Sequence, residues 1–437
     1  MRVQIFSFDE SRSIIYCPDT LRFFVASKND AHIAKLLATG YNARQVIHMV
    51  RGLDLISCEQ LASQLKQGDV SEATSCLHPG GLSRLVLHVS NDCNMRCRYC
   101  YAACGSYGTT RSLMDGKTLH RTLDVFYSVF SEIGLLQIFG GEPSLNLAMV
   151  REACEYVRYF KKDTHLGMVT NGTCTNDEFV QVIRDFDVDV TVSIDVSEAM
   201  TMLRPMSSPE ISSASVVHDN VLKMLAKTNQ PSQFELTYTE EHVRQGISVT
   251  DVLERLHEEY GDVPVHVTPV CAPGSRFELS SAAPFVNAVP LVYSSDCISR
   301  GIRPYALVAD YAHMLRHHIY SSRICSAGVG TVAVSTQGDI YPCFYFVGNK
   351  SFCAANVFDD EERVRRALNR MRSQFDAFAY GRCERCKTCF ANTLCHGCMG
   401  ANYEVTGQIT LPGQKQCDIT RGIIRELIEV LAHKVVK

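Results

Sequence analysis

Hydrophobic and polar positions change their pattern twice along the chain. The first 75 or so residues predict a small unit in which three short strands precede three helices. The strands are expected at 3–8, 13–17 and 22–26, and the helices at 30–37, 43–49 and 58–65. Asn42 and Ser57 are predicted to cap the second and third of these helices. A linker is expected at 77–81, where Pro79, Gly80 and Gly81 interrupt the pattern.

From residue 84, short apolar runs alternate with amphipathic stretches. Strands are expected at 85–89, 135–139, 166–170, 189–194, 234–238 and 263–268, with helices between them, as at 115–132, 148–160 and 176–185. Six such repeats predict an α/β fold, a partial (β/α)6 parallel barrel of TIM type whose site lies at the carboxyl ends of its strands. The alternation ends near residue 271, and 271–320 has no clear pattern. An amphipathic helix at 421–434 is expected to pack on the core.

Composition narrows the classes of protein that fit. A chain of 437 residues with 46% hydrophobic and 21% charged residues is long enough for two or three globular domains. The net charge of −4 argues against binding to nucleic acid or to a membrane surface. No run of 18 apolar residues occurs, and the first residues lack the apolar core of a signal peptide. We therefore expect a cytoplasmic protein.

The twenty cysteines are clustered, with three between 93 and 100 and five between 383 and 398. A reducing cytoplasm disfavours a disulfide framework, so this clustering indicates metal. Cys93, Cys97 and Cys100 share one loop after the first barrel strand, and thiolates suit iron–sulfur clusters or zinc. Three ligands leave one iron of a four-iron cluster open to a small molecule. A structural zinc site needs four ligands, and Cys104 does not complete a familiar zinc spacing.

This Cys-x3-Cys-x2-Cys run, with Tyr99 before the last cysteine, resembles the signature of the radical S-adenosylmethionine (SAM) enzymes. The resemblance implies a [4Fe-4S] cluster whose open iron binds SAM. Gly140-Gly141-Glu142-Pro143 resembles the GGEP motif of these enzymes, in which the glycines approach the methionyl amine and the carboxylate faces its charge. The resemblance also implies SAM contacts at later strand ends, by Asn171, Ser193 and Asp195. It further implies that Arg204 pairs with the SAM carboxylate and that Tyr99 lies near the adenine.

Simpler interpretations of these residues stay open. Gly-Gly could form only a tight turn, and Glu-Pro could only start a helix. Ser193 and Asp195, two positions apart on one strand, could form a solvated rim. Arg204 could be an exposed loop arginine, and Tyr99 a core tyrosine.

The later cysteines resemble the SPASM extension, which carries two auxiliary iron–sulfur clusters, expected as [4Fe-4S]. Position by position, the first would take Cys325, Cys343 and Cys398, and the second Cys386, Cys389, Cys395 and Cys417. The chain departs from the pattern at Cys398, which follows Cys395 after two residues rather than three. The fourth ligand of the first cluster is left open among Cys297, Cys353, Cys383 and no residue. A pair of zinc ribbons is the structural alternative.

The remaining cysteines are expected to pack as small apolar residues. These are Cys17, Cys58, Cys76, Cys154 and Cys174, together with Cys104 and Cys271, although the last two lie closer to the expected site.

The resemblance covers nearly the whole chain and implies four parts. They are a winged-helix-like leader-recognition domain at 1–78, a radical SAM barrel at 84–270, a bridging region at 271–320 and a SPASM domain at 321–437. The first could instead be a packing unit without a ligand. Enzymes of this architecture modify ribosomally made peptides (RiPP maturation), so the implied partners are a precursor peptide with its leader and an electron donor such as flavodoxin or ferredoxin.

The reaction implied is hydrogen abstraction by a 5′-deoxyadenosyl radical, followed by a crosslink, with a thioether favoured. The auxiliary clusters would accept the second electron. Other outcomes on this scaffold are epimerisation with Cys271 or Cys297 as hydrogen donor, carbon–carbon or ether crosslinks, and serine or cysteine oxidation in a sulfatase-type protein. A zinc-binding scaffold without catalysis is the alternative from another class. No residue stands out as the catalytic base.

Overall fold

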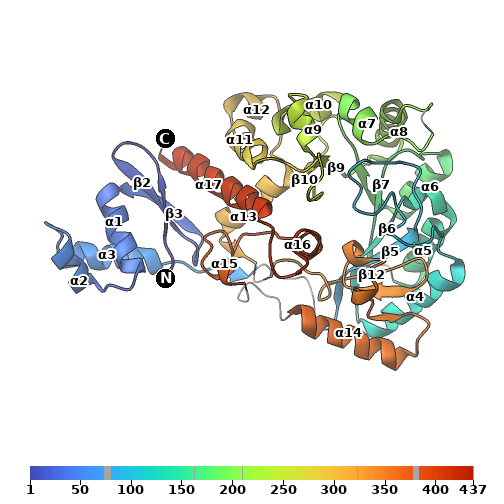
Figure 1. Cartoon of the computed structure of the whole chain (residues 1–437), viewed down its shortest axis with the longest axis horizontal. Helices are drawn as coiled ribbons and strands as arrows, with labels where there is room; N and C mark the ends of the chain where they lie inside the picture. The colour runs from blue at the N-terminus through green and yellow to red at the C-terminus, as the bar shows by residue number, and fades with distance from the viewer. Residues whose placement is uncertain (73–79, 162, 209, 322, 377–382, 437) are drawn as a thin grey trace.

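The computed structural model describes residues 1–72, 80–161, 163–208, 210–321, 323–376 and 383–436. Most of the expected linker and Cys76 lie outside the described residues. A small N-terminal unit and a larger α/β half lie at opposite ends of the long axis, and C-terminal segments lie between them (Figure 1). Every helix among the described residues is too short or too polar to cross a bilayer.

A nine-stranded sheet forms the larger half, and six of its strands run parallel in chain order. They are β5 (Leu82–Ser90), β6 (Ile133–Gly140), β7 (His165–Thr170), β8 (Val188–Ser193), β9 (Gln233–Tyr238) and β10 (Val265–Pro269). Each overlaps one of the six expected strands, so the predicted α/β fold with a parallel-stranded sheet is confirmed.

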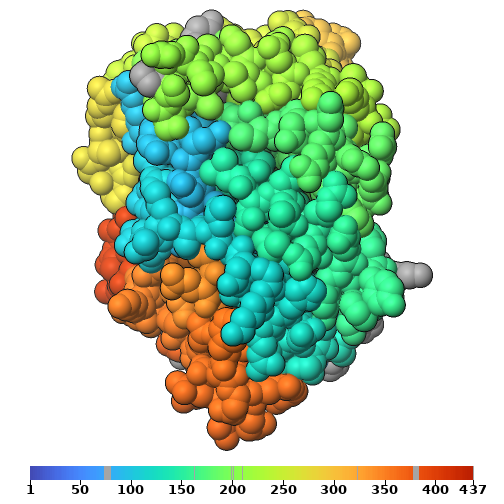
Figure 2. Space-filling model, turned by 90° about the vertical axis from the view of Figure 1, so that its right-hand side faces the viewer, coloured from blue at the N-terminus to red at the C-terminus, as the bar shows by residue number. Residues whose placement is uncertain are grey.

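Helices connect these strands, in the part of the chain coloured light blue to green that forms much of the face in Figure 2. They are α4 (Gly116–Val129), α5 (Leu147–Phe160), α6 (Asp177–Phe186), α7 (Ser197–Leu203), α8 (Ser213–Thr228), α9 (Glu240–Arg244) and α10 (Val249–Tyr260), with a short 3-10 turn, η1 (Pro143–Asn146). In α4, Asp115 caps the first turn by accepting a hydrogen bond from Thr118 N. Its stripe of Leu119, Leu123 and Phe126 is fully buried, which orients the helix on the sheet.

The sheet continues beyond β5 into the C-terminal third of the chain. Strand β12 (Thr331–Val334) pairs parallel with β5, and β13 (Asp339–Tyr341) and β14 (Ala355–Asn356) follow antiparallel. After them, α14 (Glu361–Asp376) lies along the lower edge of the molecule (Figure 1). The first barrel strand is therefore covered by a segment that the pattern of residues 84–270 did not include.

The N-terminal unit has the expected order of three strands and three helices. It comprises β1 (Gln4–Ser7), β2 (Arg12–Cys17), β3 (Arg22–Ser27), α1 (Lys28–Ala38), α2 (Ala43–Met49) and α3 (Leu55–Lys66). Asn42 caps α2 as predicted. The predicted cap Ser57 is wrong, because Asp54 caps α3 and Ser57 N donates to its carboxylate. Because Asp54 rather than Ser57 accepts the capping hydrogen bond, the helix starts one turn earlier than predicted.

The C-terminal helix joins the two halves. It runs as α17 (Gln414–Val436), longer than expected, and packs against α11 (Ala283–Val292), α13 (Ala306–His317) and β3. Phe8 of the N-terminal unit stacks on His433 of α17, with ring centroids 4.3 Å apart. The bridging region also contains α12 (Ser295–Ser299) and β11 (Ile319–Tyr320), which pairs with β4 (Ser71–Glu72).

Candidate functional site

The first cysteine loop lies at the carboxyl end of β5 and is fixed by backbone pairing with the segment after α7. Arg96 N donates to Pro205 O at 2.8 Å, and Arg98 N donates to Leu203 O at 2.9 Å. Ser207 N donates to Asn94 O at 2.8 Å, and Met95 and Met206 form an antiparallel bridge. The loop is therefore held like a short strand, with Arg204 brought directly beside it.

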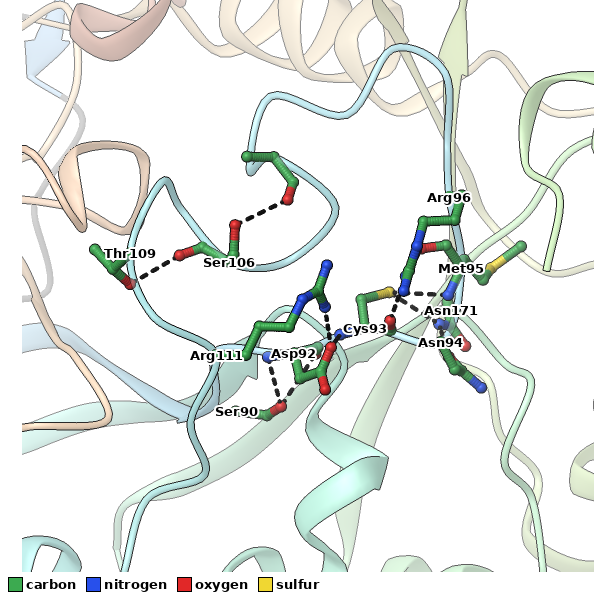
Figure 3. Close-up of polar contacts among 11 residues, drawn as sticks. Ser90, Asp92, Cys93, Asn94, Met95, Arg96, Ser106, Thr109, Arg111 and Asn171 are labelled. Carbon is green, nitrogen blue, oxygen red and sulfur yellow. Dashed lines mark hydrogen bonds and ion pairs between the residues drawn. The ribbon is translucent and has the colours of Figure 1, made fainter. Parts of the chain in front are cut away.

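The three cysteines of this loop are half-buried neighbours without disulfides. Cys93 Sγ accepts hydrogen bonds from Met95 N at 3.4 Å and from Asn171 Nδ2 at 3.7 Å (Figure 3). Burial, with a smaller contribution from the nearby Glu142 and Cys97, raises the pKa of Cys93 to about 12. Burial and Cys97 likewise raise the pKa of Cys100. Thiolates gathered in such a place need a bound cation or cluster to compensate their charge, so the three residues fit an iron–sulfur group.

Gly140 and Gly141 bring the end of β6 against this loop. A Cβ at Gly140 would lie 2.2 Å from Ser90 O, and one at Gly141 would lie 2.2 Å from Asp92 O. The same two carbonyls accept hydrogen bonds from Gly141 N and Glu142 N at 2.7 Å. The side of each glycine that a Cβ would occupy is thus filled by the cysteine loop.

Gly105 completes this close contact, and sequence reasoning missed it. Its φ is +89°, and a Cβ there would lie 2.7 Å from Cys93 Cβ and 2.9 Å from the Cα of Gly141. Its place five residues after Cys100 was the available signal. Beside it, Arg111 forms an ion pair with Asp92, whose Oδ1 also accepts a hydrogen bond from Cys93 N (Figure 3).

Glu142 is buried and connects the ends of β6 and β7. Its Oε1 accepts hydrogen bonds from Ser144 N at 3.0 Å and from Thr170 Oγ1 at 2.6 Å. Its Oε2 accepts one from Asn171 N at 2.7 Å, which leaves that oxygen able to accept another. Burial raises the pKa of Glu142, and these hydrogen bonds oppose the shift.

Asn171 connects β7 to the cysteine loop through Asn94, which sequence reasoning did not single out. Asn171 Nδ2 donates to Asn94 Oδ1 at 2.9 Å, and Asn94 Nδ2 donates to Thr173 Oγ1 at 2.8 Å. Asn94 lies between Cys93 and Cys97, so an amide inside the cysteine spacing was its signal. These bonds hold the cysteine loop against the end of β7.

Asp195 and Arg204 form a buried charged group on the other side of the loop. Both are 4% exposed. Burial lowers the pKa of Arg204, but Tyr99, Cys97 and Asp195 raise it to a value above its ordinary one. Burial raises the pKa of Tyr99 well above its usual range. Arg204 is therefore not an exposed loop arginine, and Asp195 is not part of a solvated rim.

One oxygen of Asp195 is held by protein and the other is not. Oδ1 lies 3.0 Å from His242 Nε2 and accepts a hydrogen bond from Val196 N at 2.9 Å. Oδ2 is buried without a hydrogen-bond partner among the described residues. His242, whose Nδ1 faces Thr239, was not predicted as a site residue. An orphaned carboxylate oxygen beside a buried guanidinium fits a polar, zwitterionic ligand such as SAM. Ser193 is half-buried at the end of β8.

The C-terminal cysteines gather in two groups. Burial, together with the nearby Cys398 and Cys325, raises the pKa of Cys343 to about 12. In the second group, burial together with the neighbours Cys417, Cys389 and Cys386 raises the pKa of Cys395 to about 12. These are the sets that the resemblance implied for two auxiliary clusters.

The three residues considered as a further ligand lie elsewhere. Cys297 is buried in α12, with its sulfur within 4.8 Å of carboxylate oxygens of Glu254 and Asp296. Cys353 Sγ donates to Ala355 O at 3.6 Å at the edge of the sheet. Cys383 adjoins the second group, where its carbonyl accepts a hydrogen bond from Cys386 N.

An aromatic contact joins the first cysteine loop to the first C-terminal group. Tyr101 follows Cys100, and its ring stacks on Tyr345 with centroids 4.7 Å apart and planes 9° apart. Phe344, which follows Cys343, packs on Phe139 of β6 at 4.9 Å. The two cysteine sites therefore adjoin at the same end of the barrel.

Known proteins resemble this chain in part of its sequence and in its fold. The radical SAM superfamily profile matches residues 87–217, so this part of the chain is a radical SAM domain. An uncharacterised protein of Methanocaldococcus jannaschii is 32% identical over 127 residues, which are 29% of this chain and 43% of that relative. The chain thus spans less than half the length of that relative.

Solved structures share the fold at low identity. The structure of anSMEcpe with bound AdoMet has a TM-score of 0.67 at 17% identity, covering 82% of this chain and 94% of that one. Streptococcus suis SuiB bound to its precursor peptide SuiA has a TM-score of 0.56 at 14% identity, covering 94% of this chain and 98% of that one. Both likenesses extend well beyond residues 87–217.

Proposed function

We propose that this enzyme binds SAM beside a [4Fe-4S] cluster on Cys93, Cys97 and Cys100 and modifies a ribosomally made precursor peptide, with a thioether crosslink as the favoured product. The observation that carries the proposal is the convergence of three thiols, the buried Arg204 and the orphaned Oδ2 of Asp195 at one end of the barrel. When bound there, cluster and SAM would supply a 5′-deoxyadenosyl radical that removes a hydrogen atom from the peptide.

The residues around the loop divide the binding of SAM among them. Arg204 would pair with the methionyl carboxylate, and Glu142, through Oε2, would accept a hydrogen bond from the amine. Asp195 Oδ2 and Ser193 would face the ribose and methionine portions, with Asn171 holding the loop in position and Tyr99 near the adenine. Gly140 and Gly141 act by letting β6 approach the loop.

The C-terminal cysteines would hold two auxiliary clusters. We assign Cys325, Cys343 and Cys398 to the first and Cys386, Cys389, Cys395 and Cys417 to the second, because each set is gathered in one place. Crosslink formation removes two hydrogens from the peptide. The first leaves as a hydrogen atom. The second leaves as a proton and an electron, and the auxiliary clusters would accept the electron. A flavodoxin or ferredoxin would supply the reducing electron that starts each turnover.

A peptide substrate is supported by two relatives in fold. SuiB was solved with its precursor peptide SuiA, and anSMEcpe was solved with AdoMet and the Cp18Cys peptide at a TM-score of 0.63. We assign residues 1–78 to leader recognition, 84–270 to the radical SAM barrel, 271–320 to a bridge and 321–437 to a SPASM domain. Since the chain offers many reduced thiols for clusters, we place its activity in the cytoplasm.

The test is an anaerobic reaction of the reconstituted chain with SAM, a reductant and a short precursor peptide encoded beside its gene. We expect 5′-deoxyadenosine and a peptide lighter by about two mass units per crosslink, from two lost hydrogens. A mass that is unchanged in ordinary water, together with uptake of deuterium when the reaction is run in heavy water, would show epimerisation instead of crosslinking.

A combined change of Cys93, Cys97 and Cys100 to Ala should reduce 5′-deoxyadenosine to the background of the assay. Cys353→Ala, which alters a sheet-edge cysteine outside both groups, should leave it unchanged. Continued SAM cleavage in the triple variant, or a colourless zinc-loaded protein prepared without oxygen, would refute the proposal.

A further inference from the structure

Cys271 lies where a fourth ligand of the first C-terminal cysteine group would be needed. It follows β10 by two residues, at the carboxyl end of the last barrel strand. Ala401 lies in the first turn of α16 (Met399–Thr406), which Cys398 precedes. Ala401 N donates to Cys398 Sγ at 3.4 Å, and Cys271 Sγ approaches Ala401 O at 4.0 Å. One residue of α16 thus contacts both sulfurs.

Tyr345 gives a second, independent link between Cys271 and the group. It lies two residues after Cys343, and both Cys271 and Cys398 lie close to its hydroxyl group. A Cβ at Gly400 would lie 2.4 Å from the Tyr345 ring, so α16 packs directly on that ring. The segment that carries Cys343 is therefore fixed against both α16 and Cys271.

Cys398 is the common neighbour in this arrangement. Cys325, Cys343 and Cys271 all lie close to it, and they come from three different segments of the chain. A four-iron cluster with no open iron is held by four ligands, normally cysteine thiolates. From these contacts we infer that Cys271 is the fourth ligand of the first auxiliary cluster, an inference that rests on the cluster assignment under the proposed function.

Ligation by Cys271 fixes the role of this cluster. On binding, the thiol releases its proton and its sulfur forms the fourth iron–sulfur bond. All four irons then have protein ligands, so none is open to a substrate thiolate. The cluster would serve electron transfer, and the substrate would meet open iron only through SAM at the first loop.

The test uses the Cys93→Ala, Cys97→Ala, Cys100→Ala chain as background, because it lacks the other cluster with an open iron. Mild oxidation of a four-iron cluster with only three cysteine ligands releases one iron and leaves a paramagnetic three-iron cluster. We expect the background to keep about eight irons per chain, two full clusters, without that signal in electron paramagnetic resonance. Adding Cys271→Ala should reduce the count to about seven and produce the signal, whereas adding Cys353→Ala should not.

Thiol labelling gives a measurement that does not depend on a folded variant. In the reconstituted wild-type chain, iodoacetamide should alkylate Cys271 at least tenfold more slowly than after chelation of iron, as mapped by mass spectrometry. Equal rates before and after chelation would overturn the assignment of Cys271.

The three-iron signal in the background alone would also overturn it, because the first auxiliary cluster would then already have an open iron. Absence of iron and sulfide from the background would overturn the auxiliary clusters themselves, and this inference with them. That result is distinguishable from failure at Cys271 alone, in which clusters assemble but Cys271→Ala behaves like Cys353→Ala.

Discussion

The first cysteine loop and the second C-terminal group differ in what holds them. The loop around Cys93 is fixed by backbone hydrogen bonds to the segment after α7 and to the end of β6, all within the barrel. Three cysteines of the second group lie in short turns and the small helix α15 (Glu384–Lys387), and the fourth, Cys417, lies in the first turn of α17. The contacts of this group come from distant parts of the chain. Arg2 Nη1 donates to Asn392 Oδ1 at 2.7 Å, and Phe6 packs on Phe390 at 5.4 Å.

With the proposed clusters bound, this difference would separate a site formed by the fold from one that depends on its metal. Where the backbone of a site is already hydrogen-bonded to strands, the cluster binds to a largely preformed place. Where ligands lie on irregular segments, metal binding supplies part of the folding free energy. The same type of ligand can therefore be an addition to the fold in one region and a part of it in another.

Removal of iron should produce the largest difference in stability between the two regions. Chelation under reducing conditions should lower amide protection from hydrogen exchange in 386–395 and in α16 by roughly 100-fold or more, because these segments lose their metal crosslinks. Amides of β6, β7 and β8 should keep their protection. Equal loss of protection in the barrel strands, measured by mass spectrometry, would show that both regions depend on metal alike.

Gly105→Ala should weaken the first loop specifically. The variant places a Cβ 2.7 Å from that of Cys93 at a φ of +89°. The left-handed backbone costs about 1–2 kcal/mol and the overlap about 1–3 kcal/mol more. We expect lower unfolding free energy of the barrel and loss of iron from the first loop, measured by denaturant titration and iron analysis.

Gly108→Ala is the matched control, because its φ is +71° but no atom lies within 4 Å of the added Cβ. It should show only the backbone cost and normal iron content. The same iron loss in both variants would contradict the role given to the contact between Gly105 and Cys93.

His88 should make the barrel beneath the first loop sensitive to acid. It is fully buried on β5, both ring nitrogens lack partners among the described residues, and burial lowers its pKa to about 3. Unfolded histidine has a pKa of about 6.5. Below that pH the unfolded chain takes up a proton that the folded chain refuses, so His88 lowers stability as pH falls from 6.5 toward 3, by at most about 1.4 kcal/mol per pH unit.

His88→Gln should remove this contribution. Urea titrations of the barrel between pH 6.5 and 4 should give a shallower slope for the variant, by up to one proton. An identical slope for both proteins would mean that His88 is protonated equally in the folded and unfolded states.

Arg2→Ala should have the smallest effect, confined to the second group. It removes the hydrogen bonds from the Arg2 side chain to Asn392 Oδ1, Cys389 O and Asp19 Oδ1. Together these bonds are worth about 1 kcal/mol. Iron should leave the second group several-fold faster in a chelation time course. Arg12→Ala, which breaks an ion pair with Asp9 inside the same unit, should leave that rate unchanged.

The fold was predictable where the signal was local. Six buried apolar runs gave six strands, and Asn42 gave a helix cap, because each depends on neighbouring residues. The Ser57 prediction failed by one turn, since Ser and Asp both cap and only the folded chain shows which one accepts the hydrogen bond. Strand β12 was missed because its partner β5 lies in a distant part of the sequence.

The site divides in the same way. The spacing of the three loop cysteines predicted that they share one loop. The burial of Arg204 beside Cys97, in contrast, results from pairing between two distant segments. His242 reaches Asp195 across 47 residues, and Cys271 approaches Ala401 across 130. No spacing rule relates such residues, so packing Cys271 into the core was the simpler interpretation of the sequence.

The pairing of β12 with β5 has a consequence for cutting the chain. Along the chain, the last of the six barrel strands ends at Pro269. The outer edge of β5 is nevertheless hydrogen-bonded to residues 331–334. A fragment that stops at residue 320 would leave that edge as a row of unpaired amides and carbonyls. Such edges pair with other molecules and aggregate. The barrel is therefore not an independent piece of protein, and the shortest soluble version of it must include the segment that carries β12.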